Sequence, residues 1–223
     1  MGMVNLNRYT LKFFYHIFIN HRYTFTMKTI FYIISIILIT NLGASVADEK
    51  KKQFEEDCNN GKTISCYNMG LMYDYGDGVD EDDEKALDFY IKACDKNYYT
   101  GCTKAALIYE ESKTVKENKK EALKLYTKAC GGGDGFACHY VALDYSKRKT
   151  KAMKNISIGL YTQACENGYA PSCIYLGRMY RDSRAVTRDL EKAKEMFNLA
   201  CEENNHLGCK ELRILEELEK SGY

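Results

Sequence analysis

The sequence lacks the features of two common functional classes. It has no apolar run of the roughly 20 residues that a membrane span needs, since the longest candidate, residues 29–40, has twelve. It also has no basic stripe for nucleic acid: residues 1–47 hold four of the 32 bases and no acid, which leaves residues 48–223 with 28 bases against 31 acids. We therefore expect no nucleic-acid partner. We also expect no membrane association once an N-terminal signal has been removed.

Catalytic motifs are equally scarce. Serine enzymes that open β-lactams use S-x-x-K with S-D-N and K-T-G, and the last two are absent. The one S-x-x-K, Ser146 to Lys149, is of the number expected by chance and falls in an expected loop. His139 and His206 each stand alone beside a cysteine, which favours packing or surface roles over metal binding. We expect no metal and no cofactor, and the sequence identifies no catalytic residue.

The N-terminal region has the layout of a secretory signal peptide. Met27 and Lys28 precede the apolar run, and Ala47 ends a stretch of small residues before the polar Asp48. Residues 27–47 are thus predicted to be cleaved, with an uncleaved anchor as the alternative. Residues 1–26 are aromatic-rich and precede a complete signal, so they are either a mis-assigned start or an extended n-region. We expect a secreted or periplasmic protein consisting of residues 48–223.

The cysteines are the strongest pattern. All ten fall into five pairs with the spacing C-x(7)-C, and the first member recurs after 36, 36, 35 and 36 residues. Such a period marks a repeat protein built from one supersecondary unit. The pairs are Cys58 with Cys66, Cys94 with Cys102, Cys130 with Cys138, Cys165 with Cys173, and Cys201 with Cys209.

Two helical patterns recur in every unit. Counted from the second cysteine, positions 0, 3, 4 and 7 form one helical face, and we name the resulting elements A-helices. Counted back from the first cysteine of the last four pairs, the neighbour is alanine and the fourth residue is aromatic, which gives B-helices. The expected A-helices contain residues 66–73, 102–109, 138–145 and 173–180. The expected B-helices contain residues 86–93, 122–129, 157–164 and 193–200.

Individual positions carry further predictions. Small residues at position 4 should let a neighbouring helix come close: Gly70, Ala106, Ala142 and Gly177. The tyrosines at position 7 should fill the core, each hydroxyl with a partner: Tyr73, Tyr109, Tyr145 and Tyr180. The third unit departs from the pattern, with Gly159 inside its B-helix, so we expect it to be looser.

The turn between paired cysteines is regular too. The third residue after each first cysteine is always Gly or Asn, the residues that tolerate the left-handed conformation that closes helices. The residue before each second cysteine is Ser, Gly or Ala, which suits the start of the A-helix, with the cap there or one residue away. Facing helix ends can bring paired cysteines within disulfide range, at about 2.5 kcal/mol per bridge. Zinc is the alternative, disfavoured by the spacing and by secretion.

These observations predict an all-α fold, a right-handed α/α solenoid of four helix pairs joined by disulfides. Residues 48–57 should form an N-terminal cap, and residues 211–220 a divergent, charged C-terminal cap. We expect a monomer.

The stretch from Gly70 to Cys94, with its Gly-Asp-Gly-Val loop and its Lys-Ala and Lys-Ala-Cys segments, resembles the Sel-one-like repeat, a relative of the tetratricopeptide repeat. With a cysteine pair in every unit, residues 58–209 resemble the Helicobacter cysteine-rich protein (Hcp) family. Only the first unit keeps the Gly-x-Gly-Val loop. The resemblance implies secretion, penicillin binding with weak β-lactamase activity, and recognition by a host.

A non-enzymatic binding module is the other reading. Stacked helix pairs form a concave groove lined by the A-helices, and this groove could hold a peptide, a β-lactam, a peptidoglycan-derived fragment or a host protein. Counted from the second cysteine, positions 2 and 6 should face it. The candidate groove residues are Asn68, Lys104, Tyr140, Tyr175, Met72 and Met179, with Ile108 and Asp144 at the same positions.

Overall fold

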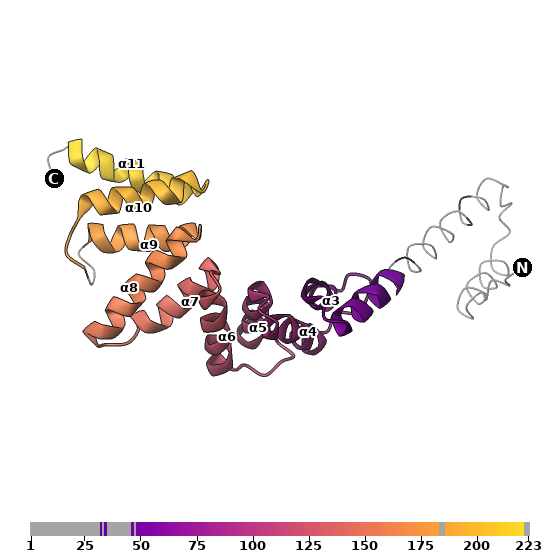
Figure 1. The fold of residues 1–223 in the computed structure, drawn as a ribbon. Helices are drawn as coiled ribbons and strands as arrows, with labels where there is room; N and C mark the ends of the chain where they lie inside the picture. The colour runs from indigo at the N-terminus through magenta and orange to yellow at the C-terminus, as the bar shows by residue number, and fades with distance from the viewer. Residues whose placement is uncertain (1–31, 33, 35–45, 47, 183–185, 221–223) are drawn as a thin grey trace, which may run out of the picture. The chain divides into compact units, whose positions relative to one another are not determined.

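The computed structural model describes residues 32, 34, 46, 48–182 and 186–220 (Figure 1). The chain divides into two units, residues 1–48 and 49–223, and the second contains all the helices discussed below. The predicted signal peptide, residues 27–47, and the residues before it lie outside the described residues apart from positions 32, 34 and 46, so the signal peptide stays a prediction. Among the described residues, no helix combines the length and the apolar character that a membrane crossing requires.

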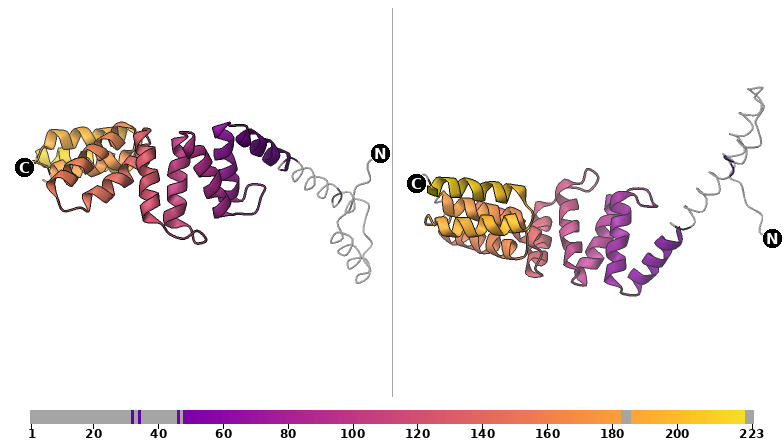
Figure 2. Two further views of the ribbon diagram at one scale, coloured as in Figure 1. Left: turned by 60° about the horizontal axis from the view of Figure 1, so that its bottom comes forward. Right: turned by 90° about the horizontal axis from the view of Figure 1, so that it is seen from above.

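The described part of the second unit is built of helices, which confirms the all-α prediction. Residues 48–59 are helical and occupy the place of a first B-helix. The A-helices are α3 (Thr63–Tyr75), α5 (Tyr99–Glu111), α7 (Gly135–Ser146), α9 (Ala170–Arg181) and α11 (His206–Lys220). The B-helices are α4 (Asp83–Asp95), α6 (Lys119–Gly131), α8 (Lys151–Glu166) and α10 (Leu190–Glu202). Each helix packs against the next in sequence, as a solenoid requires (Figures 1 and 2).

The turns from B-helix to A-helix close as predicted. The residue three positions after each first cysteine has a positive φ in every turn. These residues are Gly61, Asn97, Gly133, Gly168 and Asn204, with φ between 57° and 95°. Each turn can therefore reverse the chain within a few residues, because only glycine and asparagine adopt this conformation readily.

The predicted caps of the A-helices are wrong by about three residues. The helices begin earlier, and the residue before each second cysteine lies inside the first turn. Asp134 is a true cap, since its side chain accepts from the backbone of Ala137 at 2.9 Å. The small residues serve packing instead: a Cβ on Gly101 would lie 3.0 Å from the Cβ of Ala93, and one on Gly208 would lie 2.6 Å from that of Ala200.

All ten cysteines are joined in disulfides, each within one C-x(7)-C pair as the spacing predicts. The Cα atoms of the paired residues lie 4.5 to 4.8 Å apart, and none of the described cysteines is free. The zinc alternative is therefore wrong, because no described thiolate is left to bind a metal. The five bridges join Cys58 to Cys66, Cys94 to Cys102, Cys130 to Cys138, Cys165 to Cys173, and Cys201 to Cys209.

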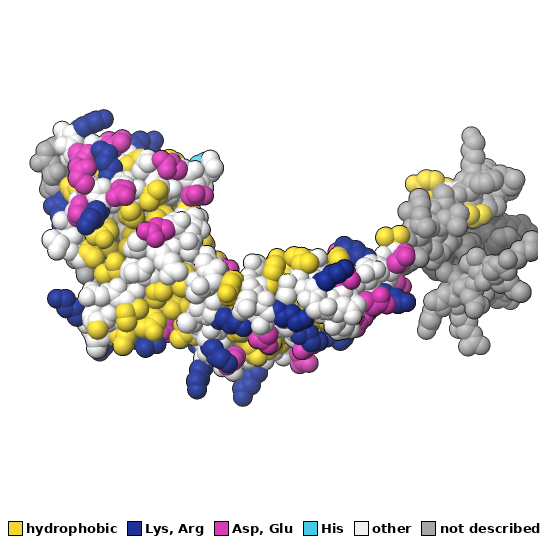
Figure 3. Space-filling view, in the orientation of Figure 1, with side chains coloured by type: hydrophobic (Ala, Val, Ile, Leu, Met, Phe, Trp, Pro, Cys, Tyr) yellow, Lys and Arg dark blue, Asp and Glu magenta, His cyan; other side chains and the backbone are white. Residues whose placement is uncertain are grey.

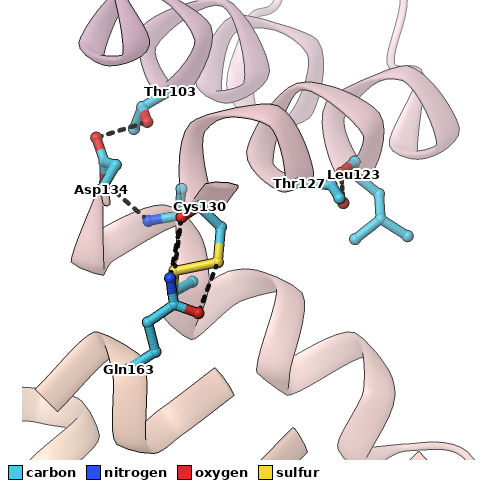
Figure 4. Close-up of a disulfide and its surroundings, with 8 residues drawn as sticks. Thr103, Leu123, Thr127, Cys130, Asp134 and Gln163 are labelled. Carbon is cyan, nitrogen blue, oxygen red and sulfur yellow. Dashed lines mark hydrogen bonds between the residues drawn. A yellow bond between two sulfur atoms is a disulfide. The ribbon is translucent and has the colours of Figure 1, made fainter. Parts of the chain in front are cut away.

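The turn around Cys130 shows how the bridges connect neighbouring units (Figure 4). Gln163 of α8 donates from Nε2 to the Cys130 carbonyl at 3.3 Å, and Thr103 of α5 donates to Asp134 at 2.8 Å. One disulfide-bonded turn is therefore hydrogen-bonded to the unit before it and to the unit after it.

The core is formed by the aromatic residue of each B-helix. Tyr90, Tyr126, Tyr161 and Phe197 are all at most 1 % exposed. The small residues of the A-helices lie opposite, as predicted. A Cβ on Gly70 would lie 2.4 Å from the Tyr90 ring, and one on Gly177 would lie 2.5 Å from the Phe197 ring.

The tyrosines at position 7 are less buried than predicted. Tyr73 is buried and stacks on Phe89 at 5.8 Å between ring centroids. Tyr109, Tyr145 and Tyr180 are only half-buried. They lie near the solvent-facing ends of their helices, where cations cover two of the rings: Arg148 lies 4.6 Å from the Tyr145 centroid and Lys192 lies 5.5 Å from that of Tyr180.

Candidate functional site

The candidate groove residues fall into two groups. Asn68, Lys104 and Tyr140 are half-buried and Tyr175 is exposed, so these four side chains are accessible on the A-helices. Met72, Ile108 and Met179 are buried, because position 6 turns toward the neighbouring helix. Position 6 is thus more buried than expected, although Met72 and Ile108 still line the pockets described below. Met179 in particular is a core residue.

The remaining candidate, Asp144, is half-exposed and pairs with Arg148 four residues later at 2.7 Å. Figure 3 shows basic, acidic and apolar side chains interspersed along the described helices.

A polar network at the first two units positions two of the accessible side chains. The Tyr90 hydroxyl donates to Asp74 at 2.8 Å, and Lys104 Nζ lies 3.6 Å from the same carboxylate. Lys104 also donates to the Tyr75 hydroxyl at 2.8 Å, with its Nζ 5.1 Å from the ring centroid. Burial raises the pKa of Tyr90, and Asp74 raises it further, so Tyr90 acts as a donor at every physiological pH.

Lys104 stays charged in this network. Burial acts to lower the pKa of Lys104, but the hydrogen bond to Tyr75 and the charge of Asp74 outweigh it, and the net pKa is raised. The buried Tyr90 thus orients Asp74, Asp74 holds Lys104, and Lys104 holds Tyr75. Tyr75 itself remains 66 % exposed.

Two open pockets meet at Tyr75. The first, named here the carboxylate pocket, has a volume of about 460 Å³ and lies between the ends of α3 and α5 and the loops that follow them. Its walls include Glu81, Asp83 and Glu111, and its apolar part comes from Leu107 and Ile108.

The second, named the apolar pocket, has a volume of about 410 Å³. Phe54, Leu71 and Met72 supply its apolar surface, and Asn68 lies at the same site. The two pockets share Tyr75 and together include four of the eight residues predicted to face the groove.

The A-helices in the middle of the solenoid present stacked tyrosines. Tyr140 stacks on the buried Tyr126 at 5.1 Å, and Tyr175 stacks on the buried Tyr161 at 5.0 Å. His139 lies between them, 2.7 Å from Ser172 through its Nδ1, and its pKa is lowered by burial. His139 is thus a packed, neutral residue at pH 7, and among the described residues no group of three or more side chains could hold a metal ion.

The S-x-x-K motif has no catalytic geometry. Ser146 is the last residue of α7, and its hydroxyl donates to the Leu143 carbonyl at 2.8 Å. Lys149 lies in the exposed loop that follows, three residues beyond the helix end. A catalytic serine needs a base held within hydrogen-bonding distance, and no described hydrogen bond or ion pair holds Lys149 there.

Sequence reasoning overlooked Tyr75, Glu111 and Glu211. Tyr75 and Glu111 stand seven residues after Asn68 and Lys104, so extending the same helical face by two turns would have found them. Glu211 was expected to be part of a solvated cap. Instead it is 7 % exposed and accepts hydrogen bonds from Arg178 and, at 2.6 Å, from Arg181.

Comparison with known proteins supports the repeat assignment. Residues 63–98, 100–134 and 170–205 match the sequence model of the Sel1 repeat, which confirms the predicted Sel-one-like repeat and leaves the third unit unmatched. A search of curated protein sequences finds no significant match.

Among solved structures, a Sel1 repeat protein from Oxalobacter formigenes is similar at 21 % identity and a TM-score of 0.62, over 79 % of this chain and 80 % of that one. Helicobacter pylori cysteine rich protein B is similar at 25 % identity and a TM-score of 0.46, over 58 % of this chain and 94 % of that one. The protective antigen c5321 of uropathogenic Escherichia coli has 18 % identity and a TM-score of 0.48, and this chain spans 44 % of its length. The likeness to the Oxalobacter formigenes protein, together with the matched repeats, shows that the described unit has the fold of a Sel1-repeat solenoid.

Proposed function

We propose that this protein is a secreted or periplasmic binding module that holds a peptide segment on the accessible face of its A-helices. The single observation that carries the proposal is the pair of adjoining pockets at Tyr75. Ligand sites combine apolar surface with a few fixed polar groups, and this site has both. Lys104 and Tyr75 are held in place by the network from Tyr90, so little side-chain freedom is lost when a ligand binds.

The proposed compartment rests on the disulfides and on the predicted leader. Disulfides persist in oxidising compartments and are rare in the reducing cytosol. Five bridges in one thin solenoid fit the periplasm or the exterior. Expression in the native host, followed by N-terminal sequencing of the exported protein, should find Asp48 as the first residue. A start elsewhere would overturn the proposed cleavage site.

The hydrolase reading rests on the resemblance to the Hcp family alone. Ser146 has no held base, and the cysteines that could bind zinc are consumed in disulfides. The one serine–histidine hydrogen bond among the described side chains, between Ser172 and His139 at 2.7 Å, is buried and offers no nucleophile at the surface, so we give β-lactam turnover no role in the proposed function.

The test is the turnover of a chromogenic cephalosporin by the purified, oxidised protein, beside a reduced and unfolded control. We expect no turnover above the control. Many turnovers per molecule that are lost on reduction would overturn the proposal and make the protein a hydrolase with an unrecognised site. In parallel, a display library of random dodecapeptides should yield binders that Tyr75→Ala abolishes, and a library without binders would also contradict a peptide-binding module.

A further inference from the structure

We propose that the pocket pair at Tyr75 selects peptide segments in which an apolar side chain directly adjoins a lysine or arginine. This inference rests on the proposed function and specifies the ligand of that site. The apolar side chain would enter the apolar pocket, and the cation would enter the carboxylate pocket. Tyr75, which both pockets share, would lie against the backbone between them.

The charge of the carboxylate pocket is the reason for proposing a cationic ligand group. Four carboxylates and two ammonium groups line it. Lys104 is already engaged by Asp74 and Tyr75. Asp83 accepts from the hydroxyls of Ser112 and Thr114 at 2.6 and 2.8 Å. These groups are therefore used within the protein.

Glu81 and Glu111 remain, against one further cation, Lys113, so the remaining groups carry a net negative charge. Both glutamates are exposed, and neither forms an ion pair with any other residue that the structure describes. Two unpaired carboxylates in one concave pocket reinforce each other's potential and attract a cation that reaches both. A guanidinium or ammonium group at the end of a flexible apolar stem fits this pocket, because Leu107 and Ile108 can pack against the stem.

The apolar pocket carries the second half of the proposal. Phe54, Leu71 and Met72 supply the apolar surface of this pocket. Lys50 and Asp77, which also line it, form an ion pair with each other at 3.7 Å. An apolar side chain buried here gains about 25 cal/mol per Å² removed from water. Tyr75 can donate its own hydroxyl proton to a peptide carbonyl, because that oxygen accepts from Lys104.

The same charges disfavour two other ligands. β-Lactam antibiotics and the stem peptides of peptidoglycan are carboxylic acids, and a carboxylate near Glu81 and Glu111 would meet like charge. The site chemistry therefore favours a cationic peptide over both of the anionic ligands considered from the sequence.

Fluorescence anisotropy with labelled octapeptides tests the proposal. The probe is acetyl-GGSFKSGG-amide, with analogues in which glutamate replaces the lysine or serine replaces the phenylalanine. At low salt we expect the probe to bind about 10-fold more tightly than the glutamate analogue. The difference should shrink at about 0.5 M salt, where charges are screened. Loss of the phenylalanine should also weaken binding about 10-fold.

Matched variants locate the site. Glu81→Gln with Glu111→Gln should lower affinity for the probe about 2- to 5-fold per residue and leave the glutamate analogue no weaker. Tyr75→Ala should cost about 10-fold or more. The control is the double variant Glu216→Gln with Glu217→Gln on α11, which should leave affinity unchanged.

The outcomes separate the two proposals. If the glutamate analogue binds as tightly as the probe, or if the control variant weakens binding as much as the site variants do, the inference is overturned and the binding module stands. If none of the octapeptides binds while the dodecapeptide library yields Tyr75-dependent binders, the inference is again overturned alone. A library without binders overturns both.

Discussion

The first three units each bury a tyrosine at the equivalent position of the B-helix, but the hydrogen-bond partner of its hydroxyl differs between the first two units and the third. In the first two, Tyr90 donates to Asp74 at 2.8 Å and Tyr126 donates to Glu110 at 3.0 Å. In the third, Ser146 replaces the carboxylate and donates to its own helix, and the buried Tyr161 hydroxyl has no hydrogen-bond partner among the described residues. Burial raises the pKa of Tyr161 to about 12, with Ser146 acting in the opposite direction.

The position near the end of the A-helix that holds Asp74, Glu110 or Ser146 can have two roles. The carboxylate accepts the hydrogen bond of the buried tyrosine hydroxyl. In the first unit, the same carboxylate also pairs with Lys104 at the proposed ligand site. In the third unit, where the carboxylate is missing, Tyr175 stacks on the buried Tyr161, as Tyr140 also does on Tyr126 in the second unit. The third unit is also the one that the Sel1 repeat model does not match. The buried tyrosine is thus common to the first three units, while the residue at the end of the A-helix differs between them: Asp74, Glu110 and Ser146.

The largest expected effect comes from the disulfides and should not distinguish the units. Replacing Cys94 and Cys102 by alanine, or Cys165 and Cys173, should each lower the free energy of unfolding by about 2.5 kcal/mol, because both bridges close loops of equal length. Urea denaturation of the two double variants measures this. A much smaller loss for the third unit would show that this unit is already unfolded locally, as its glycine and missing hydrogen bond could allow.

Glycine-to-alanine substitutions should change the free energy of unfolding in opposite directions in the first and third units. Gly70→Ala should cost about 2 kcal/mol, because the added Cβ meets the immobile Tyr90 ring. Gly159→Ala in α8 should instead stabilise the protein by about 1 kcal/mol. The added Cβ would have no other atom within 4 Å, and alanine has a higher helix propensity than glycine. Thermal and urea unfolding of both variants gives the comparison. Equal destabilisation would contradict the packing described here.

Tyrosine to phenylalanine substitutions test the orphaned hydroxyl directly. Tyr126→Phe should cost about 1.5 kcal/mol, since it removes a hydrogen bond to a carboxylate. Tyr161→Phe should be neutral or slightly stabilising, because it removes a buried polar atom without a partner. The fourth unit already carries phenylalanine, Phe197, at this position. Equal costs for the two variants would mean that Tyr161 has an acceptor after all.

The smallest effect concerns pH at the last helix. Burial acts to raise the pKa of Glu211, but hydrogen bonds from Arg178 and Arg181 outweigh it and the net pKa is lowered. The folded pKa then lies below the unfolded value, so the stabilisation is present above about pH 4.5 and is lost as pH falls through the folded pKa. Glu211→Gln should cost about 1 kcal/mol at about pH 7 and less at about pH 3. Urea curves at both pH values measure this difference, and a cost that is independent of pH would rule out an ion pair.

The sequence predicted what the repeat period controls. The turn glycines and asparagines, the cysteine pairing and the small residues beneath the aromatic rings each depend on short-range geometry that recurs every 35 or 36 residues. Helix starts were misplaced because three A-helices begin after Lys62, Tyr98 and Tyr169, none of which forms a side-chain cap. Tyr75 and Glu211 were missed because their roles depend on residues from neighbouring units, and a pattern read within one unit does not show such contacts.

The most direct test of the binding role is an NMR titration of the ¹⁵N-labelled, disulfide-bonded protein with the octapeptide acetyl-GGSFKSGG-amide. Saturable shifts should be confined to the amides of the two pockets, with the largest at Asn68, Tyr75, Lys104 and Glu111. The amides of α9 and α11 should remain unchanged. Shifts that concentrate on α9 or α11, or that do not saturate, would contradict a peptide site at Tyr75.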